Sequence, residues 1–338
     1  MSLNRKLRCV TIGLVSLGFP LAADAQETKP EYSLDMQTVF GEGHIVSDTV
    51  QAFAQRANEM SDGRIDVTVR YGSPFGDFYE TARQLAQGST EIGTFVASSE
   101  LDKRFTITLM GGLVTDWDQA RKIYGPDGPF LKLVNEIGED VGVKYIAWVP
   151  TGFGGIPFQG DDAPSTLPSP KSYKVRIPPF RSMEARFEAL GFNTVTMPFS
   201  ETYTAMQTGV IDGKGATPPE EAYQSFADVT GVYLYSKDYF EVVIGIGVNV
   251  DWLNGLPEED RQIIETAGLE AARGAWAVAE DVEEESLQKF EKNGSIELRR
   301  LSADEHKKVQ SIIRDAEWPV IEEGIGSEMM SRIKSMAQ

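Results

Sequence analysis

Residues 173–209 read YKVRIPPFRSMEARFEALGFNTVTMPFSETYTAMQTG, and this stretch decides the fold class of the chain. Residues 173–177 are rich in β-branched side chains and precede two prolines. This predicts a strand, because proline cannot donate to a sheet ladder. A helix is predicted over 182–191, a second strand over 194–197 and a second helix over 200–209. Alternating strands and helices with short links are typical of a parallel sheet covered by helices.

A cation and an aromatic ring are predicted at two neighbouring strand ends. Arg176 lies near the end of the first strand, and Phe199 follows the second. Ligands of such sheets bind beyond the carboxyl ends of the strands. The planar fork of arginine pairs with a carboxylate or sulfonate through two hydrogen bonds. A structural ion pair that holds the strand to a neighbour is the open alternative for Arg176.

The composition predicts two domains and excludes one class of partner. The chain has 338 residues, more than one typical domain, and 41% of them are hydrophobic, which is enough for a sizeable core. The formal net charge is -19 and no basic face is apparent. We therefore expect no nucleic-acid partner.

The first 25 residues are typical of a secretory signal peptide. A basic start is followed by an apolar run over 10–22, too short to span a bilayer, and by Ala-Asp-Ala at 23–25. We predict cleavage after Ala25 and export to the periplasm; an N-terminal membrane anchor is the alternative. The only cysteine, Cys9, leaves with this peptide, so we expect neither a disulfide nor a thiolate metal site.

The rest of the chain indicates a second α/β unit and a connection between two lobes. Strands and helices also alternate over 34–97. Proline, glycine and serine accumulate over 150–170, which favours a crossing between lobes. The apolar run 242–250 is typical of a buried strand that returns to the first lobe. A helix over 257–292 would be roughly 50 Å long, enough to lie across both lobes. Its three glutamates at 283–285 are expected to form a solvated face.

The sequence offers no set of catalytic residues. It contains no His-Glu-x-x-His run, no Gly-x-Ser-x-Gly elbow and no phosphate-binding loop. The two histidines, His44 and His306, lie far apart in the sequence. We therefore expect a protein without enzyme activity, cofactor or metal. An exported enzyme that uses Glu42 or Asp212 is the alternative.

Five segments carry a family resemblance: YKVRIPP at 173–179, ALG at 189–191, MPFSETYTAMQTGVIDG at 197–213, SDGRI at 61–65 and LPEEDR at 256–261. Together they resemble the solute-binding proteins of tripartite ATP-independent periplasmic (TRAP) transporters, the DctP type. The resemblance extends over essentially the whole mature chain, and the run at 197–213 is long and specific.

The resemblance implies an α/β fold of the periplasmic-binding-protein type, with a ligand cleft between two lobes and a long helix spanning both. We expect a signal peptide at 1–25, lobe I at 26–150 plus about 241–275, and lobe II at 151–240 plus about 276–338. The implied function is capture of a small organic acid and its delivery to TRAP membrane permease subunits. We expect a monomer.

The resemblance also assigns candidate ligand contacts. The arginine matching Arg176 would bind the ligand carboxylate, and the phenylalanine matching Phe199 would line the pocket. The polar turn at Glu42 to His44 would touch the ligand from the other lobe, although a role at the start of a helix is equally open for His44. The aromatic residue matching Tyr239 is a further candidate.

Two departures from the family pattern bear on the ligand. Residues 214–218 read KGATP where the family usually has Gln-Glu-Asn-Pro, so Thr217 is the candidate for the place of the ligand-binding asparagine. Trp148 is another candidate contact. After it, Gly-Phe at 152–153 continues with Gly154, where many members carry arginine. The second cation that a dicarboxylate would use is therefore missing from that place.

These departures leave the ligand class open. Arg176 fits a carboxylate or a sulfonate, whereas Glu42 could meet the cationic group of a zwitterion such as an ectoine. A ligand-sensing subunit of a signalling receptor would share the binding step and is a further alternative.

Overall fold

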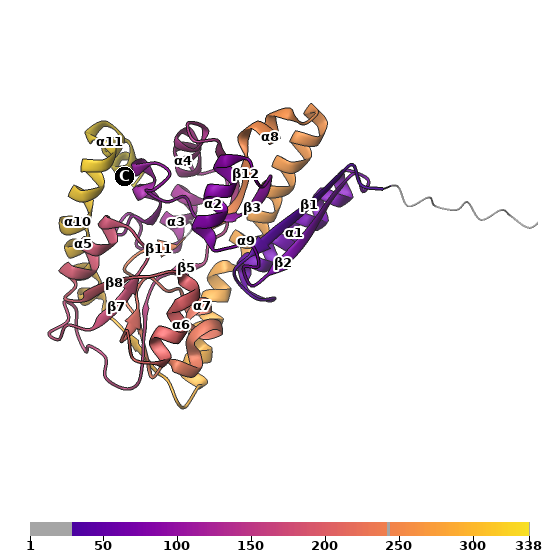
Figure 1. Cartoon of the computed structure of the whole chain (residues 1–338). Coiled ribbons are helices and arrows are strands. Elements are labelled where there is room, and N and C mark those ends of the chain that lie inside the picture. Colours follow the sequence, from indigo (N-terminus) through magenta and orange to yellow (C-terminus); the bar gives the residue numbers. More distant parts are fainter. Residues whose placement is uncertain (1–28, 242–243, 338) are drawn as a thin grey trace, which may run out of the picture.

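The structure, a computed structural model, describes residues 29–241 and 244–337. The predicted signal peptide and its cleavage site after Ala25 lie outside these residues. The described chain is an α/β protein of two lobes, as predicted from the sequence (Figure 1). Within these ranges, no helix is both long and apolar enough to cross a membrane.

The first lobe is built around two small sheets. β1 and β2 are parallel, whereas β12 pairs with β3 on one side and β4 on the other in antiparallel fashion. Val50, Phe53 and Ala57 recur at helical spacing on α1 and are buried against this core. The elements of this lobe are β1 (Tyr32–Thr38), α1 (Ile45–Met60), β2 (Ile65–Tyr71), α2 (Phe78–Gln87), β3 (Ile92–Phe95), the 3-10 helix η1 (Lys103–Leu109), α3 (Trp117–Tyr124), α4 (Pro129–Glu139), β4 (Val143–Trp148), β12 (Gly245–Asn249) and α8 (Val250–Gly255).

The second lobe contains a six-stranded sheet in the order β13-β10-β6-β9-β7-β8. Its elements are β6 (Ile156–Phe158), β7 (Lys174–Ile177), α5 (Arg181–Ala189), β8 (Asn193–Thr196), α6 (Phe199–Gln207), β9 (Gly213–Lys214), α7 (Pro219–Phe226), the 3-10 helix η2 (Ala227–Val229), β10 (Val232–Tyr235) and β13 (Glu297–Arg300). The predicted strand–helix–strand–helix stretch is confirmed as β7, α5, β8 and α6. β7 is parallel to both β8 and β9, so that Arg176 pairs with Val195 on one side and Lys214 on the other.

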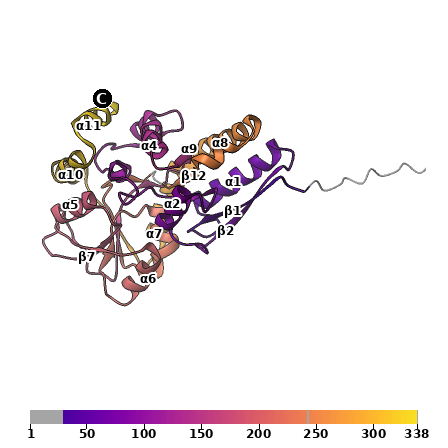
Figure 2. The ribbon, with the colours of Figure 1, turned by 45° about the horizontal axis from the view of Figure 1, so that its top comes forward.

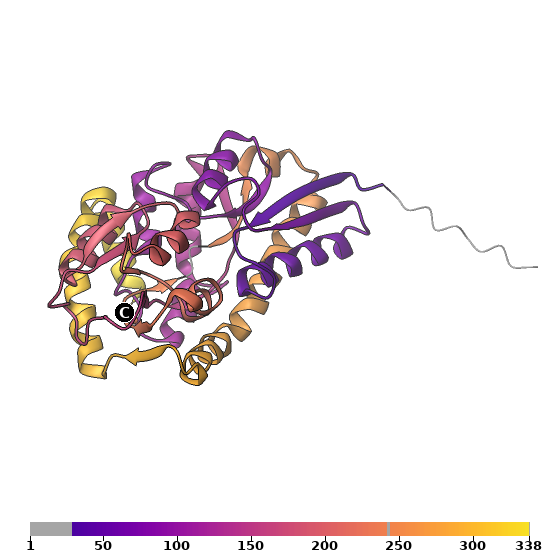
Figure 3. The same cartoon turned by 60° about the horizontal axis from the view of Figure 1, so that its bottom comes forward.

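Three connections join the lobes. Two are short strands, β5 (Gly152–Phe153) and β11 (Phe240–Glu241), which pair with each other in antiparallel fashion. The third is α9 (Glu258–Lys292), which packs on α1 in the first lobe and on α7 in the second (Figures 1 and 3). The predicted long helix that spans both lobes is therefore confirmed. The lobe boundaries assigned from the sequence stay a prediction.

The prediction that 283–285 form a solvated face is wrong for Glu283. Its carboxylate is buried and accepts hydrogen bonds from Trp117 Nε1 (3.2 Å), the Tyr235 hydroxyl (2.7 Å) and the Phe153 backbone N–H (2.5 Å). Burial raises the pKa of the Glu283 carboxyl. The middle of α9 lies against the connecting strands. These strands cover the side of the helix that carries Glu283, although its sequence neighbours are also charged. Gly152 allows this approach, because a Cβ there would collide with the Glu283 carboxylate.

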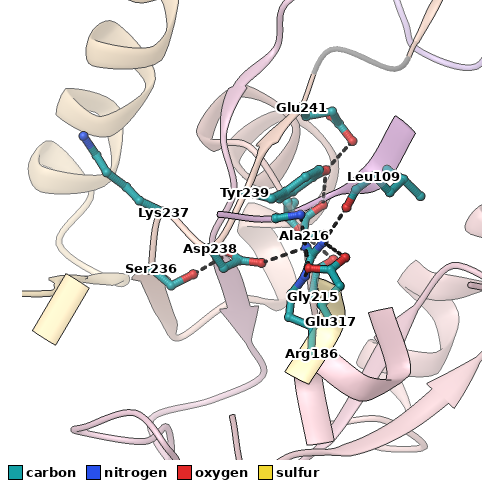
Figure 4. Close-up of polar contacts among 12 residues, drawn as sticks. Leu109, Arg186, Gly215, Ala216, Ser236, Lys237, Asp238, Tyr239, Glu241 and Glu317 are labelled. Atoms are coloured by element: carbon teal, nitrogen blue, oxygen red, sulfur yellow. Dashed lines mark hydrogen bonds and ion pairs between the residues drawn. The ribbon is translucent and has the colours of Figure 1, made fainter. Parts of the chain in front are cut away.

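A second buried cluster joins the C-terminal helices to the rest of the protein. These helices are α10 (Ala303–Ile325) and α11 (Ser327–Met336). Arg186 of α5 has no exposed surface and donates to both oxygens of Glu317 on α10, at 2.9 and 2.6 Å (Figure 4). It also donates to the Leu109 carbonyl, and Asp238 lies 3.6 Å away. One arginine therefore links α5, α10, the end of η1 and the segment leading into β11.

We expect Glu317→Gln to lower the free energy of unfolding by about 3 kcal/mol, because it leaves the buried Arg186 guanidinium without its paired carboxylate. The urea midpoint of the unfolding transition measures this loss. Glu323→Gln removes an exposed carboxylate from the same helix and serves as the control. Equal midpoints for the two variants would contradict a structural role for the Arg186–Glu317 pair.

Candidate ligand-binding site

A small cavity of about 50 Å³ lies where the two lobes meet and brings together the predicted residues Arg176, Phe199 and Tyr239. Its apolar walls come from both lobes and are formed by Phe78, Val96, Leu109, Pro178, Phe199 and Ile244. Its charged residues are Arg176, Lys214, Glu221 and Glu241. A larger hollow of about 330 Å³, between α9 and the start of α10, lies outside the cleft. We take the smaller cavity as the candidate site because it combines the cleft with buried charge.

Arg176 is the cation that β7 carries to the cavity wall. Only 3% of its surface is exposed, and its Nε and Nη2 donate to the Met197 carbonyl at 3.1 and 2.9 Å. Across the described residues, no carboxylate oxygen lies within 4.0 Å of the guanidinium. Burial lowers the pKa of Arg176, but an arginine remains charged. Two of its five N–H groups are used, which leaves the Nη1 edge available to an anion in the cavity.

Lys214 is the second buried cation, on the neighbouring strand β9. Its Nζ lies 2.8 Å from Glu221 Oε1, 3.0 Å from Thr217 Oγ1 and 3.4 Å from the Ala216 carbonyl. Burial lowers the pKa of Lys214, and the charge of Glu221 opposes that shift. The ammonium is therefore neutralised by the protein itself.

Thr217, predicted from the sequence to replace a ligand-binding asparagine, is fully buried beneath Lys214. Its hydroxyl lies 3.0 Å from the Lys214 carbonyl and from the Lys214 ammonium. It lies outside the lining of the cavity as the structure describes it. A direct contact between Thr217 and a ligand stays a prediction.

Tyr239 and Glu241 extend the site onto the connection between the lobes. The Tyr239 hydroxyl lies 2.6 Å from Glu241 Oε1 (Figure 4). The Thr151 hydroxyl donates to Glu241 Oε2 at 2.7 Å. Burial and, second, the charge of Glu221 raise the pKa of Glu241 to about 7, against the lowering effect of Lys214. This carboxyl therefore changes its charge close to neutral pH.

Phe199 closes the site from the second lobe. Its ring lies 6.0 Å from Phe40 and 6.5 Å from Phe78, both in the first lobe, as measured between centroids. The two lobes therefore touch through aromatic rings beside the cavity, as expected for a closed arrangement.

The polar turn at residues 42–44 lies at the start of α1. Glu42 is exposed and does not line the cavity. His44 is buried, its Nδ1 accepts from the Val46 N–H at 3.2 Å, and its ring stacks on Phe40 at 3.7 Å. Burial lowers the pKa of His44 to about 3, so the imidazole is neutral. Its role at the start of the helix is thus seen directly, whereas ligand contacts from Glu42 and His44 stay predictions.

Trp148 lies in the core of the first lobe, not on the cavity wall. Its ring packs 5.8 Å from Phe130 and 5.5 Å from Tyr145. Its contact with a ligand also stays a prediction.

A polar contact bridges the cleft beside the cavity. Glu220, at the start of α7 in the second lobe, accepts from the Ile45 N–H at the start of α1 in the first lobe, at 3.2 and 3.3 Å. Gln224 donates to the Gly43 carbonyl at 3.2 Å. A carboxylate at a helix N-terminus is stabilised by the helix dipole. These contacts can form only while the lobes are close together.

Sequence reasoning missed Lys214, Glu221 and Glu241. Glu221 reads as an ordinary acid in the first turn of a helix, and Glu241 as the end of a polar segment. Lys214 could have been predicted from the sequence. It directly follows Asp-Gly, at the end of a strand that a parallel sheet can place beside Arg176.

A family model and two relatives match most of this chain. The family model DctP, "Bacterial extracellular solute-binding protein, family 7", matches residues 36–317. The C4-dicarboxylate-binding periplasmic protein DctP of Rhodobacter capsulatus is 24% identical over 98% of this chain and 98% of its own. The ectoine-binding periplasmic protein TeaA of Halomonas elongata is 23% identical over 86% of this chain and 83% of its own.

Solved structures share the fold. The sugar acid binding protein DctPAm of Advenella mimigardefordensis, in complex with galactonate, superposes with a TM-score of 0.83 and 20% identity, covering 91% of this chain and 98% of that one. A TRAP periplasmic solute binding protein of Rhodoferax ferrireducens, with bound malonate, gives 0.78 and 22%, covering 90% and 97%. Because the family model covers most of the sequence, the chain belongs to family 7 of the bacterial extracellular solute-binding proteins, the DctP type of TRAP transporters.

Proposed function

We propose that this chain is exported to the periplasm, holds a small organic anion of the carboxylate class in the cavity between its lobes, and delivers it to TRAP membrane permease subunits. Arg176 carries this proposal, because it is a buried cation that faces a cavity without a carboxylate partner among the described residues. An unpaired buried charge is costly, and a ligand carboxylate would compensate it through two charge-assisted hydrogen bonds.

Closure of the lobes would allow a permease to distinguish the ligand-bound protein from the free one. A ligand that contacts both lobes favours the closed form over the open one, and the closed form is the one that a permease would recognise. The cavity is lined by both lobes, and Glu220 bridges the cleft beside it. These contacts support closure of the lobes over a ligand. The proposal also includes cleavage of the signal peptide after Ala25 and function as a monomer.

The protein acts without breaking a bond of its ligand. Membership of a family of solute-binding receptors supports this function over an exported enzyme. Turnover of a bound acid would instead identify an enzyme. Co-purification with a receptor kinase in place of a permease would identify a ligand-sensing subunit.

A zwitterion is the second candidate ligand, because one observation favours it. Glu241 places a carboxyl group on the cavity wall, where it could accept from a cationic group while Arg176 holds the carboxylate. The ectoine-binding relative supports this alternative. A sulfonate would use the same face of Arg176 and is distinguished only by a binding screen.

Arg176→Lys should weaken ligand binding by about tenfold or more, because lysine keeps the charge but loses the planar fork. Isothermal titration calorimetry with an acid found by a thermal-shift screen measures this change. Arg181→Lys alters an exposed arginine five residues away and is the matched control. Unchanged affinity in Arg176→Lys would remove Arg176 from the site.

The pH dependence of affinity should separate the two candidate ligands. Ionisation of Glu241, with its pKa of about 7, adds a negative charge to the wall as the pH rises. A carboxylate should therefore bind up to about tenfold more weakly at pH 8 than at pH 6, whereas a zwitterion with its cation at Glu241 should bind more tightly. Glu241→Gln cannot titrate and reports the contribution of the other groups. An identical pH dependence in wild type and Glu241→Gln would exclude Glu241 from contact with the ligand.

Glu220→Gln should weaken binding by about threefold, because it removes a charge–dipole contact that exists only in the closed form. Affinity should be measured near pH 8, because burial raises the pKa of Glu220 to about 7 and the carboxyl is mostly ionised above that value. Stopped-flow release of the ligand should be correspondingly faster. Glu285→Gln changes an exposed glutamate and is the control. Equal release rates in the two variants would show that Glu220 does not stabilise closure.

A further inference from the structure

Two buried cations lie side by side at the cavity, yet only one of them is available to a ligand. Parallel pairing of β7 and β9 places Arg176 opposite Lys214. Each is only 3% exposed, and both line the cavity. By its two cations alone, the site could hold two carboxylates. The protein groups that already pair with each cation argue against this.

The ammonium of Lys214 is surrounded by acceptors of the protein. Glu221 lies 2.8 Å away as an ion-pair partner, and the Thr217 hydroxyl at 3.0 Å and the Ala216 carbonyl at 3.4 Å accept hydrogen bonds. The charge of Lys214 is therefore compensated before a ligand enters. Arg176, by contrast, spends two of its five donors on one carbonyl.

Glu221 is fixed in this position by the first turn of α7. Its neighbour Glu220 points to the start of α1, about 100° around the helix, while Glu221 faces the cavity. Glu241 lines the same cavity, and the charge of Glu221 is felt there. A second carboxylate on a ligand would therefore meet two acids and a cation that is already paired with Glu221, an arrangement that disfavours burying its charge.

The remaining walls favour an apolar group. Val96, Leu109 and Ile244 line the cavity together with the aromatic rings. The volume of about 50 Å³ is more than one water needs but well below the roughly 300 Å³ of a pocket for a drug-sized ligand. This space suits a short chain that ends in a methyl or hydroxyl group.

We propose that the Glu221–Lys214 ion pair determines specificity: it occupies the second cation, so the cavity accepts a short monocarboxylate with an apolar end and rejects the corresponding dicarboxylate. This inference rests on the proposed function, in which Arg176 holds the carboxylate. It assigns to Glu221 the role of a specificity residue that acts through Lys214. It also gives a physical consequence to the KGATP segment, which departs from the family pattern.

Pairs of acids that differ only in a methyl or carboxylate end test the inference on the wild-type protein. Calorimetric titration with butyrate against succinate, and 2-hydroxybutyrate against malate, measures the preference. We expect the monocarboxylate of at least one pair to bind about tenfold or more tightly than its dicarboxylate. A wild-type preference for succinate or malate would overturn the inference while leaving the proposed function intact.

Glu221→Gln releases the Lys214 ammonium and should shift the preference toward the dicarboxylate by about tenfold or more. The double variant Lys214→Gln/Glu221→Gln has no second cation and should keep the wild-type preference. Glu285→Gln, an exposed change of the same charge, should leave both affinities unchanged. Circular dichroism and thermal melting establish that each variant is folded. If Glu221→Gln does not fold, the wild-type pairs and the double variant still decide the question.

Two further outcomes separate the claims. A folded Glu221→Gln protein with an unchanged preference would refute the role of the ion pair, and so would a double variant that gains dicarboxylate binding. Failure of wild type to bind any acid of a broad panel would overturn the proposed function itself.

Discussion

The candidate site depends on the buried guanidinium of Arg176, which has no carboxylate oxygen within 4.0 Å among the residues that the structure describes. Taking a charge out of water costs several kcal/mol unless a partner replaces the lost hydration. The fold gives Arg176 only the Met197 carbonyl as its hydrogen-bond acceptor in the part of the chain that the structure describes. In the proposed function, an anion that enters the cavity would complete this arrangement. The same interaction would then favour both ligand binding and closure of the lobes.

The two buried carboxyl groups at the connection between the lobes differ from Arg176, because protein donors already pair with them. Glu283 on α9 accepts from three elements, and Glu241 is held by Tyr239 and Thr151. Such satisfied networks resist rearrangement. Across the cleft, the Glu220 carboxylate of α7 accepts from the Ile45 N–H at the start of α1, and these two helices belong to different lobes (Figure 2). In the proposed function, the lobes would part at the cleft while the connecting strands and α9 keep their contacts.

The sequence predicts the fold to the extent that local patterns determine it. The alternation of strands and helices over 173–209 and the long helix after Pro257 follow from periodicity and stop signals, and both are observed. The burial of Glu283 could not be predicted, because it depends on which face of α9 meets the connecting strands. For the same reason the pairing of Lys214 with Glu221, which requires β9 and α7 to be positioned in three dimensions, escaped sequence reasoning.

A crystal structure of the mature protein with an acid identified by the binding screen tests most directly whether Arg176 holds the ligand. We expect both oxygens of one ligand carboxylate to lie about 2.7–2.9 Å from Arg176 nitrogens, in the cavity between the lobes. A ligand bound elsewhere, with Arg176 still contacting only the Met197 carbonyl, would contradict this expectation.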